Sequence, residues 1–480
     1  MPWTFAMTRF PLSLALLAAL LAGCSTAPPY ERPAIDLPAA FKEGVPGSGV
    51  WHIAQPQDPV PDDWWTLLGD DTLNALQAQA ATGNQNVALA LGRLRAARAA
   101  LGSSQAGLLP SVGASASANR ARNGSTTTAS GTTVITTGRL TTTDALSLNA
   151  SWELDLWGRL AGAVDAASAS ALASAGDLAA MRLSVQASVN QTYLALRAAE
   201  AQGAVLAETL AAYARMGELT RNRYRAGVAS AADVAQAEAQ LKSTQAQQME
   251  AEITRAQLEH ALAVLVGQAP AQFSLPSTAR LPEVPPVPAQ LPSRLLERRP
   301  DIAAAERRVA AANAQIGVAR AAFFPALTLS ASTGYRGAAL SDLVAAPNLF
   351  WALGPALAAS VFDGGLRAAG VESARATLDQ TAATYRQTVL TALQEVEDSL
   401  VVATVLEREQ QTQAEAVAAA QRALEVVTNQ YRAGTVAYLN VLTAQTTVLS
   451  ARRSLIDVRS RRLVAVGTLL KNIAGRWPAL

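Results

Sequence analysis

Side chains that commonly carry catalysis or bind metals are scarce in this chain. It has one cysteine, Cys24, and two histidines, His52 and His260, spread over 480 residues. A zinc site needs three or four ligands held close together, and a Cys/His nucleophilic pair needs both residues within hydrogen-bond reach. The sequence also lacks a glycine-rich phosphate loop of the P-loop kind. It therefore predicts a protein that is not an enzyme and has no metal or other bound cofactor.

The position of Cys24 indicates covalent modification instead. Residues 1–23 have an arginine near their start, an apolar run and small residues at the end, which is typical of a secretory signal. The segment Leu21-Ala-Gly-Cys24 resembles the processing signal of bacterial lipoproteins, which implies an S-diacylglycerol and an N-acyl group on Cys24. Ser25 stands where lipoproteins retained in the inner membrane carry Asp, so the resemblance implies sorting to the outer membrane. Residues 24–62, rich in Pro and Gly, are expected to form a lipidated tether.

Charge and composition narrow the class of protein further. The 39 basic and 37 acidic residues give a net charge of only +2 and form no basic run, so nucleic acid is not an expected partner. Half of the chain is apolar, but only 5% is aromatic. This composition favours long, closely packed helices over a compact mixed core.

An internal repeat organises the chain. The segment Asn222-Arg-Tyr-Arg-Ala-Gly227 returns 207 residues later as Asn429-Gln-Tyr-Arg-Ala-Gly434, and Gly107-Leu-Leu-Pro110 parallels Ala322-Phe-Phe-Pro325. We therefore predict a first structural repeat over 63–270, a Pro-rich linker over 271–292, and a second repeat over 293–480.

Each repeat is predicted to contain a helix, a strand pair, a very long helix and a returning helix. Helices 84–107 and 301–322 precede the strands. The first repeat has strands near 111–120 and 143–156 and a helical hairpin over 158–267. The second has strands near 326–336 and 349–362 and a hairpin over 365–473. Because Gly227 and Gly434 stand where a left-handed helix stop is needed, they mark the two hairpin tips.

The predicted strands alternate between apolar and polar residues, as in Leu146, Leu148 and Leu154 against Ser147, Asn149 and Asp155. Such strands with aromatics near their ends fit a transmembrane β-barrel, and alone they fit a small soluble antiparallel sheet equally well. Four strands cannot close a barrel, so in the membrane several chains would have to share one. The candidate membrane-interface aromatics are Trp152, Trp157, Tyr335, Phe350 and Trp351. No later stretch is apolar enough to predict a transmembrane helix.

These features together resemble the outer-membrane factor family, the TolC- and OprM-like ducts whose lipidated branch is called NodT-type. The resemblance covers the mature chain. It is carried by the segments Leu295-Leu-Glu-Arg-Arg-Pro-Asp-Ile302 and Ala321-Ala-Phe-Phe-Pro325 and by the twin Tyr-Arg-Ala-Gly turns.

The resemblance implies a mainly helical fold with a membrane β-barrel. Three identical chains would form it, each giving four strands to a 12-stranded barrel and helical hairpins to a periplasmic tunnel. It implies an outer-membrane, lipid-anchored duct for small molecules. Its partners would be outer-membrane lipid, a periplasmic adaptor and an inner-membrane transporter of the RND type. Two alternatives stay open: an outer-membrane duct for type I protein secretion, and a lipid-anchored coiled-coil adaptor. The sequence does not identify the transported substrate.

The resemblance also implies a gate at the periplasmic end. Tyr431 and Asp233 match positions that link helices in the TolC pattern, but the matching arginine is replaced by Val436, for which Arg432 is a candidate substitute. The positions of two aspartate rings fall on Asn440 and Thr443, which are uncharged, so an acidic constriction is in doubt. Asp233 has a second reading as a helix cap, because it stands three residues after Ser230.

Overall fold

The computed structural model describes residues 27–36, 41–42, 51–53, 63–122, 125–129, 132–136, 140–285, 287–290 and 299–473. Cys24, the signal over 1–23 and most of the tether over 24–62 lie outside these residues. Two compact units share the described chain, and each draws residues from both repeats. We call them the sheet unit and the helical unit and describe each by itself.

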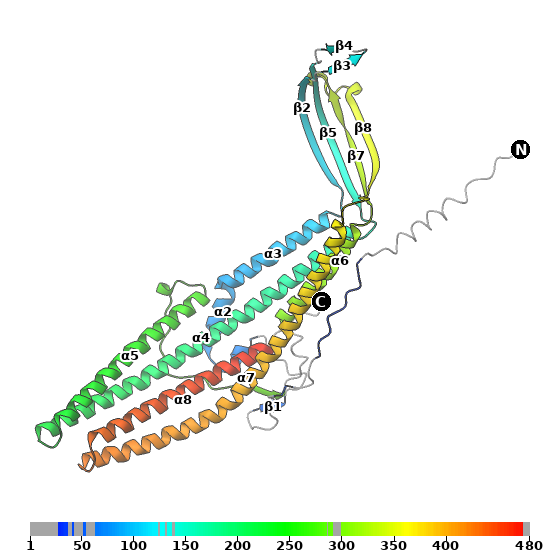
Figure 1. The fold of residues 1–480 in the computed structure, drawn as a ribbon. Helices are drawn as coiled ribbons and strands as arrows, with labels where there is room; N and C mark the ends of the chain where they lie inside the picture. Colours follow the sequence, from blue (N-terminus) through cyan, green and yellow to red (C-terminus); the bar gives the residue numbers. More distant parts are fainter. Residues whose placement is uncertain are drawn as a thin grey trace. The chain divides into compact units, whose positions relative to one another are not determined.

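The repeat is visible in the order of elements (Figure 1). The first copy runs through α3 (Gln85–Ala106), β2 (Ser111–Arg122), β5 (Leu140–Leu154), α4 (Arg159–Arg225) and α5 (Ala231–Leu265). The second runs through α6 (Pro300–Ala321), β7 (Ala326–Gly337), β8 (Leu349–Ala358), α7 (Leu366–Arg432) and α8 (Tyr438–Ile473).

Several shorter elements were absent from the sequence prediction. Among the described residues these are α2 (Asp71–Gly83), the small hairpin of β3 (Ser125–Ala129) and β4 (Thr132–Thr136), and four 3-10 turns. The Pro-rich linker contains β6 (Val287–Gln290), which pairs in parallel with β1 (Trp51–Ile53). Strand β5 begins three residues before the predicted strand 143–156 and ends two residues before its end, and β8 ends four residues short of 362.

The sheet unit contains a four-stranded antiparallel sheet in the order β2-β5-β7-β8 (Figure 1). The central pair β5–β7 joins the two repeats, with Leu146 opposite Tyr335 and Trp152 opposite Leu329. Strands β2 and β8 form the two open edges and run in opposite directions, since each strand is antiparallel to its neighbour.

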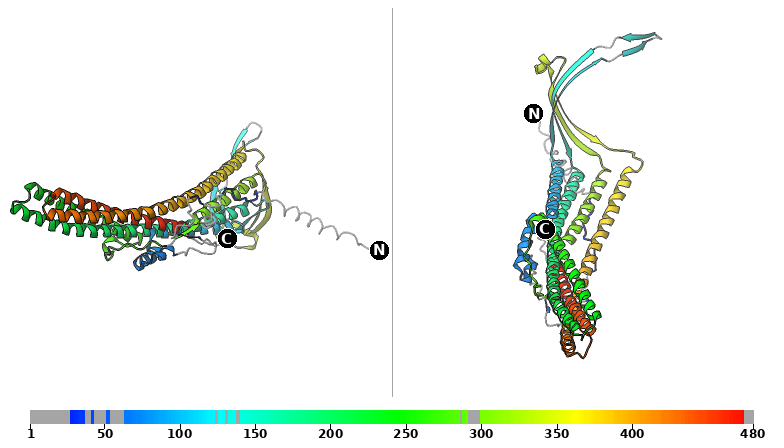
Figure 2. Two further views of the ribbon diagram at one scale, coloured as in Figure 1. Left: turned by 90° about the horizontal axis from the view of Figure 1, so that it is seen from below. Right: turned by 90° about the vertical axis from the view of Figure 1, so that its left-hand side faces the viewer.

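The helical unit is built on the long helices α4, α5, α7 and α8, which lie side by side there (Figure 2). Helices α4 and α7 each run for 67 residues without proline, because Ala, Leu and Gln favour a continuous helix. A core cluster collects buried residues from α2, α3, α4, α5 and α8, including Leu73, Leu76, Val189, Leu194 and Leu262. Small residues allow close approach: an added Cβ on Gly176 would meet the Ala304 Cβ at 2.9 Å.

Two ionic networks, one buried and one partly exposed, also hold the helical unit together. Arg197 pairs with Glu200 at 2.7 Å, and Glu200 also accepts from Arg255 at 3.1 Å and from the backbone amide of Thr278 at 3.0 Å. This network fixes the start of the linker against α4 and α5. In the second network, Arg299 pairs with both Asp301 and Glu395 at 2.8 Å. The Arg-Pro-Asp run therefore ties the first turn of α6 to α7.

Candidate functional site

The two hairpin tips are built alike. Gly227 and Gly434 have φ angles of 75° and 79°, in the left-handed region that a glycine adopts without strain. The amide of the residue after each glycine bonds back over the last helical turn: Val228 to the Arg223 carbonyl at 2.9 Å, and Thr435 to the Gln430 carbonyl at 3.0 Å. Such bonds satisfy carbonyls at the helix end and turn the chain back sharply.

Tyr431 lies inside a small core that joins the two hairpins near these tips. It is 3% exposed and packs with Met216, Ala237, Tyr438 and Val441. Its hydroxyl lies 3.3 Å from Oγ1 of Thr220, on the first hairpin. Because Thr220 donates its own proton to the Met216 carbonyl at 3.0 Å, Tyr431 is the donor of this pair.

Arg223 is the functional candidate that the sequence analysis missed. Its guanidinium carbon lies 4.8 Å from the centre of the Tyr431 ring, and its Nη1 donates to the Arg432 carbonyl at 3.3 Å. One side chain of the first hairpin thus contacts two consecutive residues of the second. The repeat aligns Arg223 with Gln430, but it aligns Arg221 with Thr428 in the same way, so the sequence gives no signal that singles out Arg223.

Asp233 makes its described hydrogen bonds within its own helix start. Its Oδ2 accepts from the amide and the hydroxyl of Ser230, both at 2.9 Å, and its amide donates to Ser230 Oγ at 3.1 Å. This is a complete capping box. No described hydrogen bond joins Asp233 to Tyr431. Its carboxylate does act on Tyr438: burial first, and then the charges of Tyr213, Tyr431 and Asp233, raise the pKa of Tyr438 to about 12.

The remaining gate candidates do not enter this core. The side chain of Arg432 is exposed, and only its carbonyl is used by Arg223. Val436 packs against the Tyr431 core as a partly buried apolar residue. Asn440 and Thr443 are exposed on α8, and the Thr443 hydroxyl donates to the Leu439 carbonyl at 2.9 Å.

The sheet unit presents a second candidate surface. One face of the sheet has an apolar middle, where Leu148 and Ala114 lie in register on β5 and β2, and Ala331 and Leu353 on β7 and β8. Toward one end the same face carries Arg120, Thr142 and Asp144. Leu148, Leu353 and Leu357 on this face are more than half exposed. The opposite face carries serines and asparagines such as Ser115, Ser147 and Asn149, which hydrogen-bond to one another.

The predicted interface aromatics fall at the two ends of this sheet. At one end Trp157 stacks on Phe324 at 4.7 Å and donates to the Pro325 carbonyl, while Trp152 donates to the Leu108 carbonyl. At the other end lie Tyr335, Phe350 and Trp351, the last of these 76% exposed. In the register with β7, Trp152 lies opposite Leu329 and Trp351 opposite Thr333, so these two tryptophans are four residues apart, or about 13 Å at ~3.3 Å per residue.

Of the histidines and the cysteine that could carry chemistry, Cys24 lies outside the described residues. His260 is exposed on α5, and its neighbour Glu259 pairs with Arg255 at 3.0 Å. Within the described ranges no group of three or more His, Cys, Asp or Glu side chains could hold a metal ion. Among the described helices, none has the length and apolar character needed to cross a membrane.

Comparison with known proteins places the whole chain in one family. The family model described as outer membrane efflux protein matches residues 76–268 and again 291–475, one match in each repeat. The toluene efflux pump outer membrane protein TtgC of Pseudomonas putida is 32% identical over 474 residues, covering 98% of this chain and 96% of that protein. Outer membrane protein OprJ of Pseudomonas aeruginosa is also 32% identical, over 472 residues with the same coverage.

Solved structures agree in fold. The outer-membrane channel OprN superposes with a TM-score of 0.85 at 29% identity, over 95% of this chain and 100% of that one. The CusC structure gives 0.82 at 27% identity, over 94% and 100%. The repeated helix and strand order, the four-stranded sheet and the matches over nearly the whole chain have one conclusion: the chain belongs to the outer membrane efflux protein family, with a TolC-like fold.

Proposed function

We propose that this chain is the outer-membrane duct of a tripartite efflux system, through which small molecules leave the cell passively. The carrying observation is the sheet with one exposed apolar face and one hydroxyl- and amide-bearing face. An apolar face suits lipid and a polar face suits a water-filled lumen. Membership of the efflux family and relatives named as outer membrane proteins of efflux pumps support the same function.

The open edges of the sheet support a homotrimer. Unpaired edge N–H and C=O groups are too costly in lipid, so a membrane sheet must close on itself. Edge strands β2 and β8 run in opposite directions, so β8 of one copy can pair antiparallel with β2 of the next. Three copies would then close a 12-stranded barrel.

Residues 27–30, which we call the strap, lie along α6 and continue from the proposed lipid anchor on Cys24. In the sheet unit, Ala27 lies against Gly317, the Pro28 carbonyl accepts from Asn313 at 3.0 Å, and Tyr30 donates to Glu306 at 3.0 Å. The three contacts follow one side of α6 toward its C-terminal end. A diacylglycerol and an acyl chain on Cys24 would hold the protein at the outer membrane, because several chains together anchor stably.

The partners follow from the division of labour in such systems. A passive duct needs an energised inner-membrane transporter, here proposed to be of the RND type, and a periplasmic adaptor that joins the two. Relatives of similar identity carry names that mention toluene, pyoverdine or cations. Since these cargoes differ in chemistry, the duct would take its substrate from the transporter.

The hairpin-tip core is the proposed gate. Tyr431, held by Thr220 and covered by Arg223, would keep the second hairpin against the first in the closed state. Arg432, Asn440 and Thr443 are further proposed gate positions, whereas Asp233 would act mainly as the cap of α5. With Asn440 and Thr443 uncharged, the constriction would lack carboxylate rings.

Planar-bilayer conductance of the purified full-length protein tests this function, with mass photometry to count chains on the same sample. A trimer with a small, stable conductance supports a gated duct. A monomer without conductance that leaves the membrane when delipidated would overturn it and favour a lipid-anchored adaptor.

A further inference from the structure

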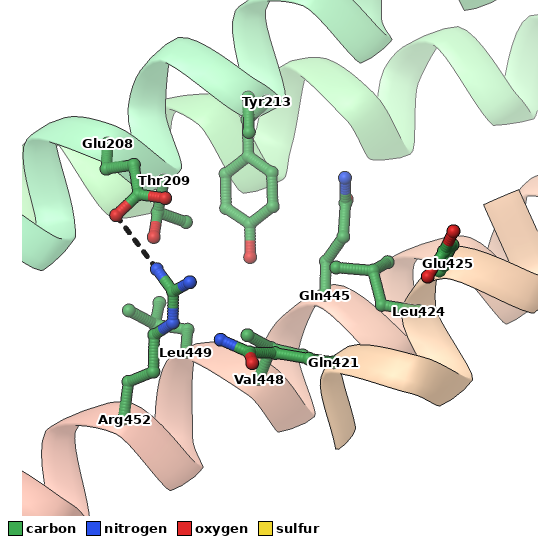
Figure 3. Close-up of a pocket in the computed structure, with 11 residues that line it drawn as sticks. Glu208, Thr209, Tyr213, Gln421, Leu424, Glu425, Gln445, Val448, Leu449 and Arg452 are labelled. Atoms are coloured by element: carbon green, nitrogen blue, oxygen red, sulfur yellow. Dashed lines mark hydrogen bonds and ion pairs between the residues drawn. The ribbon is translucent and has the colours of Figure 1, made fainter. Parts of the chain in front are cut away.

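A cavity lies in the helical unit, between α4, α7 and α8 (Figure 3), and Leu424 of its wall also packs against the core around Tyr431. Its volume is about 240 Å³. Liquid water takes ~30 Å³ per molecule, so the space equals about eight waters and suits a small organic ligand. Leu424, Val448 and Leu449 give it an apolar wall.

The charges around the cavity leave an excess of one negative charge. Arg452 Nη1 donates to Glu208 Oε2 at 2.8 Å, so these two residues neutralise each other (Figure 3). Glu425 also lines the cavity and is exposed, and it makes no ion pair or hydrogen bond among the described residues. A cation is therefore the complementary ligand charge.

Two polar groups of the wall have capacity for a ligand. Gln445 is 7% exposed, and its Oε1 is buried without a hydrogen-bond partner. The terminal torsion of a glutamine is broad, so this oxygen can turn toward a donor in the cavity. The Tyr213 hydroxyl points toward the same space, and its hydrogen bond among the described residues is a long one accepted from Gln240, at 3.4 Å. An unpaired buried acceptor favours a ligand that donates N–H bonds.

We propose that this cavity binds a small aromatic molecule carrying a protonated primary amine. Its ammonium group lies near Glu425 and donates to the Gln445 amide oxygen. Its ring lies against Leu424, Leu449 and the edge of Tyr213. This site is independent of the duct function, since it requires neither a barrel nor a gate.

Isothermal titration calorimetry of the full-length protein with 2-phenylethylammonium at about pH 7 tests the site. Saturable binding with one site per chain is expected. Glu425→Gln should weaken it about threefold to fivefold, the size of one partly exposed charge interaction. Glu415→Gln removes the same charge from an exposed position on the same helix and should leave affinity unchanged. Equal affinity of the two variants would overturn the proposal.

Two further measurements separate this site from detergent partitioning and from charge alone. The trimethylated analogue keeps the positive charge but has no N–H donor, so it should bind more weakly than the primary amine. Gln445→Met keeps the side-chain volume and removes the acceptor, and it should abolish that difference. Uptake that does not saturate, or a trimethylated analogue that binds as well as the primary amine, would contradict the proposed contacts.

Discussion

The guanidinium of Arg223 covers the ring of Tyr431, with 4.8 Å between its Cζ and the ring centre. The same guanidinium donates to the carbonyl of Arg432, so its position is fixed by two contacts from one chain turn. The first hairpin therefore holds the tip of the second through Arg223. From the sequence, the linking arginine is expected in the second repeat, at Arg432.

Replacing Arg223 should loosen the closed state of the proposed gate. A partly desolvated cation–π contact contributes about 1 kcal/mol, so Arg223→Ala should shift the closed-to-open ratio by about fivefold. Single-channel conductance in planar bilayers should rise, or long openings should become more frequent. Arg221→Ala is the control, because Arg221 pairs with Glu238 inside the first hairpin at 3.5 Å. An Arg223→Ala channel that behaves like the control would remove Arg223 from the gate.

The capping box predicts a different outcome for Asp233. Because Asp233 bonds to Ser230 in both directions, Asp233→Ala should lower the stability of the α5 start by about 1 kcal/mol and change conductance little. Ser230→Ala should cost a similar amount. The double variant should cost less than the two added together, since both remove one shared motif. Thermal unfolding measures the cost, and a conductance change in Asp233→Ala that Ser230→Ala lacks would restore the gating role.

The local features of this fold could be predicted from the sequence. Alternation in 146–154 and the long proline-free stretches each report on one element, and the twin glycine turns report on two hairpin ends. The contacts between elements could not be predicted in the same way. Arg223 meets Tyr431 across more than 200 residues, and nothing in the residues near Arg223 distinguishes it from Arg221 or Arg225.

The choice between the two roles of Asp233 shows the same limit. Its spacing from Ser230 is a local signal and predicts the cap, while its link to Tyr431 rested on a pattern taken from relatives. Val436, at the position where the TolC pattern has an arginine, packs against this core as a partly buried apolar residue. In this chain the Tyr431 hydroxyl is hydrogen-bonded to Thr220 instead. The cap at Ser230 accounts for every described hydrogen bond of Asp233.

The tyrosines of the helical unit predict a loss of stability at alkaline pH. Burial, with smaller effects from neighbouring charges, raises the pKa of Tyr438 to about 12 from an ordinary value near 10. A raised folded-state pKa contributes stability that is complete below about pH 10 and is lost as the pH rises toward 12. Thermal unfolding between these values should therefore show a smaller pH-dependent loss in Tyr438→Phe than in the parent. Parallel curves would show that Tyr438 does not ionise differently on unfolding.

Tyr193 provides an internal comparison for that experiment. Burial and its 2.6 Å hydrogen bond to Asp70 raise its pKa to about 12 as well. Tyr193→Phe should thus remove a similar share of the alkaline loss. It also leaves Asp70 without this donor, so it should lower stability at neutral pH, which Tyr438→Phe should do less because the Tyr438 hydroxyl makes no described hydrogen bond.

The contact between Ala27 and Gly317 predicts how the strap over 27–30 can be released. A Cβ on Gly317 would meet the Ala27 Cβ at 2.7 Å, closer than side chains approach, so Gly317→Ala should push the strap from α6. Cleavage after Glu31 by a glutamyl endopeptidase should become several-fold faster. Gly370→Ala is the matched control: it makes the same change inside α7, where a new Cβ would meet nothing within 4 Å. Equal cleavage rates in the two variants would mean that the strap is not held at Gly317. Retention in the membrane fraction should survive the release of the strap, because the proposed lipid on Cys24 anchors the chain independently.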